Sequence, residues 1–241
     1  MTAIRGVIFD VDGTLVDSND AHARAWVDAL KEFGYTVQFE EVRRMIGMGG
    51  DKLLPAVTGG LESDSPEGKK VSARCSEIFM KQLLPELRAL PGATELLKEL
   101  RDRGLKLVIA SSAQKEKLRE LLKIAGADGV VESATSSSDA ERSKPDPDIV
   151  QAALDNLRLP REEVVMIGDT PYDIEAAARA GLKTIGFRSG GWTDTGLEGA
   201  IAVYDGPADL LAHLDTSPLA EGAASAATPP QAEKTPQQRY V

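Results

Sequence analysis

The clearest structural signal lies close to the N-terminus, in the run Gly6-Val7-Ile8-Phe9-Asp10-Val11-Asp12-Gly13-Thr14. The run begins with a segment free of polar side chains and changes at Asp10 to acidic and turn residues. A short apolar segment bounded by turn residues is typical of a buried strand in a parallel sheet. The other predicted strands cover residues 105–110 and 164–168 and, with weaker patterns, 129–131, 183–187 and 200–203.

Amphipathic helical segments separate these strands. Leucines recur on one face of the stretches 93–103 and 115–125, and a capping residue followed by proline opens the stretches 147–157 and 172–180. Asp146 is predicted to cap the third of these helices, with Pro147 in its first turn. Alternation of strands and helices predicts an α/β fold, a doubly wound parallel sheet with right-handed crossovers.

Residues 17–87 break this alternation. Two stretches of apolar residues at helical spacing lie within them, at 21–33 and 71–83. We therefore predict an all-helical cap domain at 17–87, inserted into a catalytic core that consists of residues 1–16 and 88–215.

Composition narrows the class of protein. The 241 residues carry 28 Lys+Arg and 38 Asp+Glu, a formal net charge of −10, which argues against binding to nucleic acid or to anionic membranes. No stretch approaches the roughly 20 apolar residues of a membrane span, and the single cysteine, Cys75, favours a reducing compartment.

Residues 216–241 are rich in Ala, Pro and Gln without periodicity, which predicts a disordered tail. We expect a cytoplasmic monomer or homodimer with a small-molecule partner.

Polar residues follow three of the predicted strands. Asp10, Ser111 and Asp169 come directly after their strands, and ligands of open α/β sheets bind at this carboxyl edge. Asp12 lies two residues beyond Asp10, so an extended chain would point both carboxylates to the same side. Clustered carboxylates repel one another unless a cation lies among them, and oxygen ligands suit Mg²⁺. With the metal bound, one carboxylate could attack phosphorus while another handles the proton of the leaving group.

Two further residues could bind a phosphate group. Ser111 precedes a predicted helix, where hydroxyl and backbone N–H groups converge on an anion. Lys144 lies between Ser143 and Pro145, on a loop stiffened by prolines, and supplies a positive charge from another side. Together with the carboxylates, these residues provide what phosphoryl transfer requires.

Four of these stretches, taken together, resemble the motifs of a known family. Residues 9–15, Ser111, residues 144–147 and residues 168–173 resemble the four motifs of the haloacid dehalogenase superfamily, in the same order. The resemblance covers about residues 4–215. It implies a Rossmann-like core, with a helical cap inserted after the first motif, and a Mg²⁺-dependent enzyme.

The resemblance also implies a role for each acidic position. Asp10 matches the nucleophile and a metal ligand, and Asp12 matches the general acid/base, whose main-chain carbonyl also binds the metal. Asp169 matches the metal-binding acid. Asp173 is expected to orient metal-bound water or Lys144.

Ser111 and Lys144 match the phosphate-binding pair of the family. The second aspartate, Asp12, supplies the proton that a departing alcohol needs. Dehalogenases and phosphonoacetaldehyde hydrolases lack such an acid, so Asp12 argues against both reactions. The segment Met48–Lys52 resembles in part the cap lysine stretch of the phosphonoacetaldehyde hydrolases, and the plainer alternative for Lys52 is a solvated side chain.

β-Phosphoglucomutase is the closer alternative. His22 lies at the distance from the nucleophile that the mutases show, although a histidine beside Trp26 could equally pack inside the cap. The loop Gly47–Gly50 lacks the arginine of the mutases, which favours hydrolysis. The candidate specificity residues are His22, Gly49 and Lys52.

The sequence therefore predicts an enzyme that hydrolyses a small phosphate monoester, such as phosphoglycolate or a sugar phosphate, through an aspartyl phosphate on Asp10. A phosphosugar mutase of the β-phosphoglucomutase type is the first alternative. A non-catalytic binding protein on the same fold is the second, and the completeness of the motifs argues against it.

Overall fold

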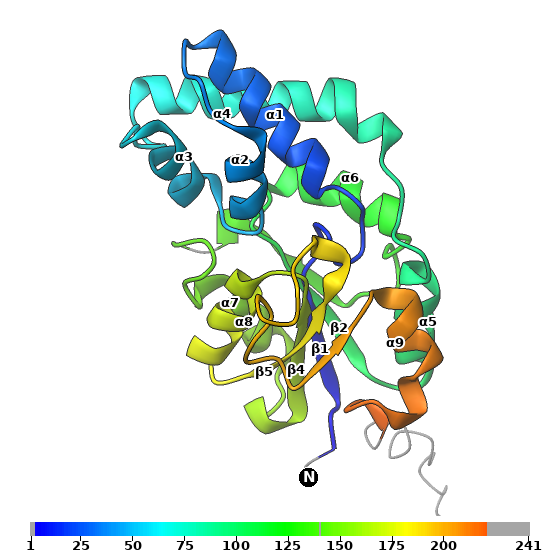
Figure 1. The fold of residues 1–241 in the computed structure, drawn as a ribbon. Helices are drawn as coiled ribbons and strands as arrows, with labels where there is room; N and C mark the ends of the chain where they lie inside the picture. Colours follow the sequence, from blue (N-terminus) through cyan, green and yellow to red (C-terminus); the bar gives the residue numbers. More distant parts are fainter. Residues whose placement is uncertain (1–2, 140, 221–241) are drawn as a thin grey trace, which may run out of the picture.

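The computed structural model describes residues 3–139 and 141–220. Within them, a six-stranded parallel sheet has the order β3-β2-β1-β4-β5-β6 (Figure 1). The strands are β1 (Gly6–Phe9), β2 (Lys106–Ala110), β3 (Ser133–Thr135), β4 (Val164–Gly168), β5 (Lys183–Phe187) and β6 (Ala202–Tyr204). Helices cover both faces, so the predicted doubly wound α/β fold is confirmed.

β1 lies in the middle of the sheet and sets its register. Phe9, its last residue, pairs with Ile109 of β2 and with Ile167 of β4. Beyond the strand, the backbone N–H of Asp10 still donates to the carbonyl oxygen of Ile167, at 2.9 Å. The three central strands therefore end nearly level, and the residues that follow them reach one common edge.

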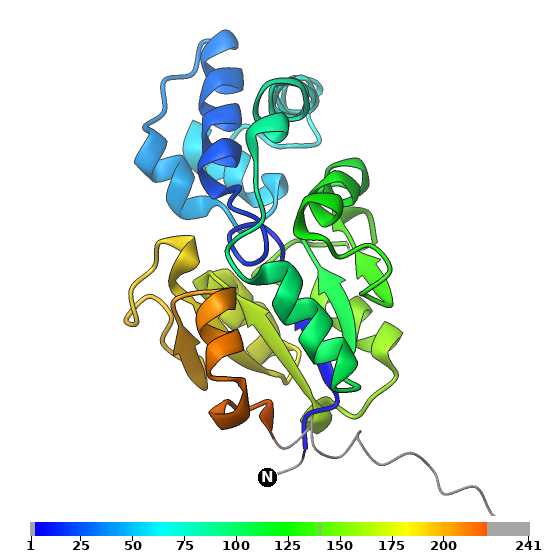
Figure 2. The ribbon, with the colours of Figure 1, turned by 90° about the vertical axis from the view of Figure 1, so that its right-hand side faces the viewer.

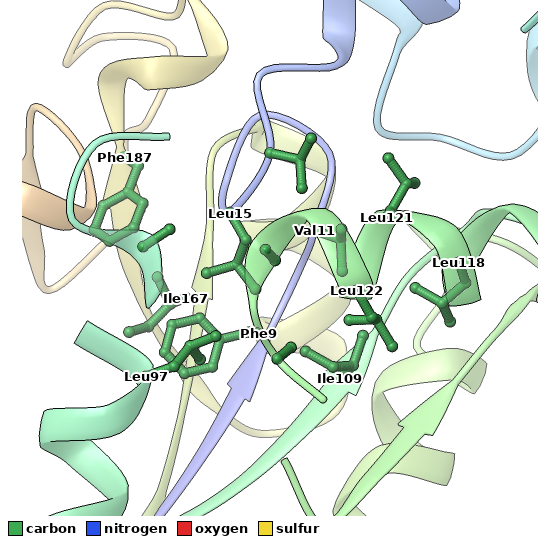
Figure 3. Close-up of a cluster of buried hydrophobic side chains, with 14 of the residues drawn as sticks. Phe9, Val11, Leu15, Leu97, Ile109, Leu118, Leu121, Leu122, Ile167 and Phe187 are labelled. Atoms are coloured by element: carbon green, nitrogen blue, oxygen red, sulfur yellow. The ribbon is translucent and has the colours of Figure 1, made fainter. Parts of the chain in front are cut away.

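The two faces of the sheet bury different sets of side chains. Val7 and Phe9 belong to one core, together with leucines of α5 (Ala93–Asp102), α6 (Lys115–Ala125) and α9 (Pro207–Ala212). Figure 3 shows Phe9 within this core. Ile8 belongs to the other core, which includes residues of α7 (Asp148–Leu157) and α8 (Pro171–Arg179). The alternation along β1 thus anchors both helical layers.

The helices between Asn19 and Ile78 form a layer over the carboxyl edge of the sheet (Figures 1 and 2). Its helices are α1 (Asn19–Glu32), α2 (Phe39–Met45), α3 (Gly50–Thr58) and α4 (Pro66–Ile78), followed by a π-helical turn at Phe79–Leu83. Small and apolar residues of α1 and α4 are buried in the core that contains Val7 and Phe9, the main core, as their helical spacing predicts. The domain boundaries stay a prediction. In the described parts of the chain, no helix is both long and apolar enough to cross a membrane.

Two local predictions were wrong. Residues 129–131 form a turn, because Gly129 has a φ of 71° and Val130 N–H donates to Ala127, so the strand begins only at Ser133. Pro147, not Asp146, precedes the first residue of α7, and it provides no side-chain cap.

The start of the predicted tail is also corrected. Leu219 is completely buried in the main core, so residues 216–220 pack against the core. The remainder of the predicted disordered tail, 221–241, lies outside the described residues.

Candidate active site

Three buried carboxylates meet at the carboxyl edge of the sheet. Asp10 follows β1, Asp169 follows β4, and Asp173 lies in the first turn of α8. One carboxylate oxygen of each lies within 4.8 Å of the others. The structure therefore brings Asp10 and Asp169 together, as the strand pattern predicts, and it adds the side chain of Asp173 to the same cluster.

Lys144 is the cation of this cluster. Its side chain is completely buried, and its ammonium donates to the carboxylate of Asp10 and, at 2.7 Å, to Oδ1 of Asp173. Lys144 lies nine residues after the end of β3, and it is 134 residues from Asp10 and 29 from Asp173 in the sequence. The predicted juxtaposition of Lys144 with Asp10 is thus present.

Asp169 is held by neutral donors. Thr14 Oγ1 donates to its Oδ1 and Asn19 Nδ2 to its Oδ2, each at 2.9 Å. This arrangement requires glycine at position 13, since a Cβ there would lie 2.2 Å from Oδ2 of Asp169. Asn19 is a site residue that sequence reasoning missed, because a lone asparagine at a helix start gives no specific signal.

Asp173 is fixed by the start of its own helix. Its Oδ2 accepts from the backbone N–H of Thr170 at 3.0 Å and from the Thr170 hydroxyl at 2.7 Å. The Thr170 hydroxyl also accepts from the Asp173 N–H, which completes a capping box. Both oxygens of Asp173 are therefore engaged, one by Thr170 and one by Lys144.

The single ammonium group of Lys144 does not balance the negative charge of the buried carboxylates. Burial raises the pKa of Asp10 well above its usual range; Lys144 opposes this rise, and the neighbouring carboxylates of Asp173, Asp169 and Asp12 add to it. Burial, and then the charge of Asp173, raise the pKa of Asp169 to about 7. For Lys144, the two acids outweigh the effect of burial and raise the pKa. The cluster therefore favours an additional cation.

A divalent metal ion fits this donor set. Three carboxylates face a single ammonium group, and hard oxygen ligands suit Mg²⁺. In addition, Oδ1 of Asn19 is buried beside Asp169 and has no hydrogen-bond partner among the described residues. A buried acceptor without a partner calls for an ion or an ordered water nearby.

The carboxylate of Asp12 is not among the three that lie within 4.8 Å of one another, although Asp12 lines the same cavity as Asp10. The extended chain ends before Asp12, and the backbone curls so that Gly13 N–H donates to Val16 and Leu15 N–H to Val11. The Asp12 side chain is thereby turned toward α1. The main-chain carbonyl of Asp12 as a metal ligand remains a prediction.

Two residues at the start of α1 hold the Asp12 carboxylate. Ser18 Oγ donates to Oδ1 of Asp12 at 2.5 Å, and His22 Nε2 lies 2.7 Å from the same oxygen. Burial raises the pKa of Asp12, but His22 and Ser18 outweigh it, so the net shift is downward. The His22 ring stacks on Phe79, with 4.0 Å between ring centroids. His22 therefore packs in the helical layer and also contacts Asp12, so the packing role and the contact with the predicted acid/base are both present.

Ser111 lies where its strand position predicts. It is completely buried, and its Oγ accepts from the backbone N–H of Ala113 at 3.1 Å. The hydroxyl of the neighbouring Ser112 donates to the carbonyl of Gly47 at 3.3 Å. The contact between Ser112 and Gly47 joins the segment before α6 to the helical layer above it.

Gly49 and Lys52 contact the Lys144 loop. Gly49 N–H donates to Ser143 Oγ at 3.1 Å, and Lys52 donates to the Ser143 carbonyl at 2.7 Å and to the Asp146 carboxylate. Lys52 is therefore neither a free amine nor a fully solvated side chain. Its ammonium is paired within the protein, which argues against its use as a specificity residue.

A cavity of about 690 Å³ opens above the site. Asp10, Asp12 and His22 line it, as do Trp26 and residues of α4 and α6. Two of its lining residues, Lys69 and Lys117, carry positive charge and were not predicted. Nothing in their local sequence sets them apart from the chain's other surface lysines.

Comparisons with known proteins agree with this geometry. The family model for haloacid dehalogenase-like hydrolases matches residues 7–187. The chain is 35% identical over 189 residues to Protein SUPPRESSOR OF QUENCHING 1, chloroplastic, of Arabidopsis thaliana; the match covers 77% of this chain but only 18% of that protein. It is 32% identical over 217 residues to a phosphoglycolate phosphatase of Rhodospirillum rubrum, with 86% of this chain and 89% of that enzyme covered.

Solved structures share the fold. A hydrolase from Pseudomonas syringae is 34% identical with a TM-score of 0.81, over 88% of this chain and 98% of that one. A Bacteroides vulgatus protein assigned as a β-phosphoglucomutase is 26% identical with a TM-score of 0.80, over 93% and 90%. The family match and the phosphatase relative together support a phosphatase hydrolase. The match over residues 7–187 confirms the resemblance of the four motifs: the chain belongs to the haloacid dehalogenase-like hydrolase family.

Proposed function

We propose that this protein is a Mg²⁺-dependent phosphatase that hydrolyses a small phosphate monoester through an aspartyl phosphate on Asp10. One observation carries the proposal. Asp10 lies beside the buried ammonium of Lys144 and lines the cavity together with Asp12, a second acid whose position is fixed by His22. A nucleophile, a positive charge and a proton carrier thus face one space.

The first step forms the phosphoenzyme. A carboxylate oxygen of Asp10 attacks phosphorus, the bond from phosphorus to the ester oxygen breaks, and the leaving alcohol takes a proton. The Asp12–His22 pair, with 2.7 Å between Oδ1 and Nε2, can hold that proton. Lys144 balances negative charge beside the nucleophile.

The second step releases phosphate. Water attacks the phosphoryl group, Asp12 accepts a proton from it, and Asp10 is regenerated. Asp10 and Asp169 would hold Mg²⁺, with the Asp12 carbonyl as a further ligand. The ion would neutralise charge on the incoming phosphate. Asp173 positions Lys144, and Ser111 is proposed to bind phosphate.

Replacing Asp12 with Asn should lower kcat for p-nitrophenyl phosphate by about 10²–10³-fold, because Asn can neither donate nor accept the proton. Mg²⁺ affinity should change little, since this carboxylate lies outside the carboxylate cluster. Steady-state kinetics and a Mg²⁺ titration measure the two effects. An unchanged kcat would remove Asp12 from proton transfer.

Mg²⁺ should stabilise the protein more at about pH 8 than at about pH 5. Without metal, the pKa of Asp169 is about 7, above its ordinary value of 3.8, so the folded protein binds more protons than the unfolded chain between these values. Stability therefore falls as pH rises through that window, and Mg²⁺, which binds the ionised form, offsets the fall. The gain in Tm on adding Mg²⁺ measures this, and equal gains at both pH values would contradict it.

A mutase assay separates the two enzyme classes. With β-glucose 1-phosphate as substrate, we expect release of free phosphate to exceed formation of glucose 6-phosphate. The reverse order would assign the chain to the phosphosugar mutases. If a broad panel of phosphate esters with Mg²⁺ gave neither product, a non-catalytic binding role would be supported instead.

A further inference from the structure

The cavity has a second charged wall, away from the carboxylate cluster. Helix α4 contributes Lys69, Ser72, Ala73 and Ser76, which are three or four residues apart and therefore share one face of the helix. The beginning of α6 contributes Lys117. This wall is polar and positively charged, although the chain as a whole is acidic.

The position of Lys117 ties this wall to the reaction centre. Its Nζ lies 5.4 Å from the centroid of the Phe79 ring, and that ring stacks on His22, which contacts Asp12. The ammonium is close enough to contribute to the lowered pKa of Asp12. Asp10 and Lys117 line the same cavity, so one small molecule could touch both.

Neither cavity lysine is neutralised by the protein. Among residues 3–139 and 141–220, Lys69 and Lys117 form no ion pair with an acidic side chain. Lys52, in contrast, is paired with Asp146. Two other acids line the cavity: Asp51 accepts a hydrogen bond from Ser143, and Glu141 forms no ion pair with either lysine among the described residues. Two uncompensated ammonium groups on one wall attract an anion.

We propose that Lys69 and Lys117 form a second anion subsite, so that the substrate carries a carboxylate or a second phosphate besides the phosphate ester at Asp10. This inference rests on the proposed function and narrows its substrate class. The hydroxyls of Ser72 and Ser76 suit a hydroxylated carbon frame between the two anions. A cavity of about 690 Å³ has room for a molecule as large as a sugar bisphosphate.

Matched substrate pairs test the subsite. The first pair, phosphoglycolate and hydroxyethyl phosphate, tests for recognition of a carboxylate. The second pair, ribose bisphosphate and ribose phosphate, tests for recognition of a second phosphate. We expect kcat/KM to be at least about tenfold higher for the doubly anionic member of one pair. Lys69→Met and Lys117→Met should each lower that preference by about tenfold, because KM rises more for the doubly anionic member of the pair than for the singly anionic one.

Neighbouring lysines serve as controls. Lys70→Met and Lys115→Met remove the same charge outside the cavity lining, and the preference should be unchanged in both. An unaltered preference in Lys69→Met and Lys117→Met would overturn the subsite while leaving the phosphatase intact.

If no ester is hydrolysed, the proposed function is refuted, but the subsite can still be tested by a binding measurement. In the presence of Mg²⁺, phosphonoacetate should bind about tenfold more tightly than methylphosphonate by calorimetry. Lys117→Met should abolish the difference. Equal affinities in the parent protein, or an unchanged difference in the variant, would overturn the subsite.

Discussion

Asp10→Asn should lower the turnover of p-nitrophenyl phosphate by at least ~10⁴-fold, the scale of loss when a catalytic nucleophile is removed. The amide is a poor nucleophile, and Asp10 is proposed to form the covalent bond to phosphorus. The fold should persist, because Asn keeps the size of the side chain and relieves repulsion among three carboxylates that share one ammonium. Initial rates under saturating Mg²⁺ measure the effect.

Asp17→Asn is a matched control for this variant. Asp17 lies on the same segment but is exposed and outside the carboxylate cluster, so its replacement should leave the rate within about twofold of the parent protein. If Asp10→Asn retained more than a small fraction of the activity while thermal melting showed a native fold, Asp10 would not be the nucleophile.

Lys144→Met should lower the free energy of unfolding by about 3–5 kcal/mol at about pH 8, because it removes one partner of a buried ion pair. Lys144 is completely buried and is the ammonium group shared by Asp10 and Asp173. The loss should shrink at about pH 5, where carboxylates with raised pKa values take up protons and need no counter-charge. Urea unfolding at both pH values measures it.

Lys81→Met provides the comparison for an exposed pair. Lys81 pairs with Glu77 on the surface at 2.8 Å, with most of its side chain in solvent, and exposed pairs contribute at most about 1 kcal/mol. A loss for Lys144→Met as small as that for Lys81→Met, or a loss that grew on acidification, would contradict the electrostatic account of the cluster.

The strand ends were the most predictable part of the site. Asp10, Ser111 and Asp169 each follow an apolar segment, and parallel strands with level ends bring such residues to one edge. Lys144 could be predicted from its place in the four motifs, since residues 144–147 lie between those of Ser111 and Asp169. By contrast, β3 has three residues and a glycine turn before it, so its position carried almost no periodic signal.

The parts of the site that could not be predicted depend on contacts between distant segments. The orientation of Asp12 follows from a tight turn and from its contacts with α1, not from the alternation of an extended chain. Lys52 finds its partner Asp146 ninety-four residues away. The roles of Asn19 and Lys117 emerge only when the helical layer lies over the sheet, because their local sequence resembles that of ordinary surface helices.

The stereochemical course at phosphorus tests the covalent intermediate most directly. An isotopically chiral phosphorothioate monoester would be hydrolysed in isotopically labelled water with Mg²⁺, and the configuration of the released thiophosphate determined. Two in-line displacements, first by Asp10 and then by water, predict overall retention of configuration. Inversion would show a single direct attack by water, and would contradict the aspartyl phosphate on which the proposed function depends.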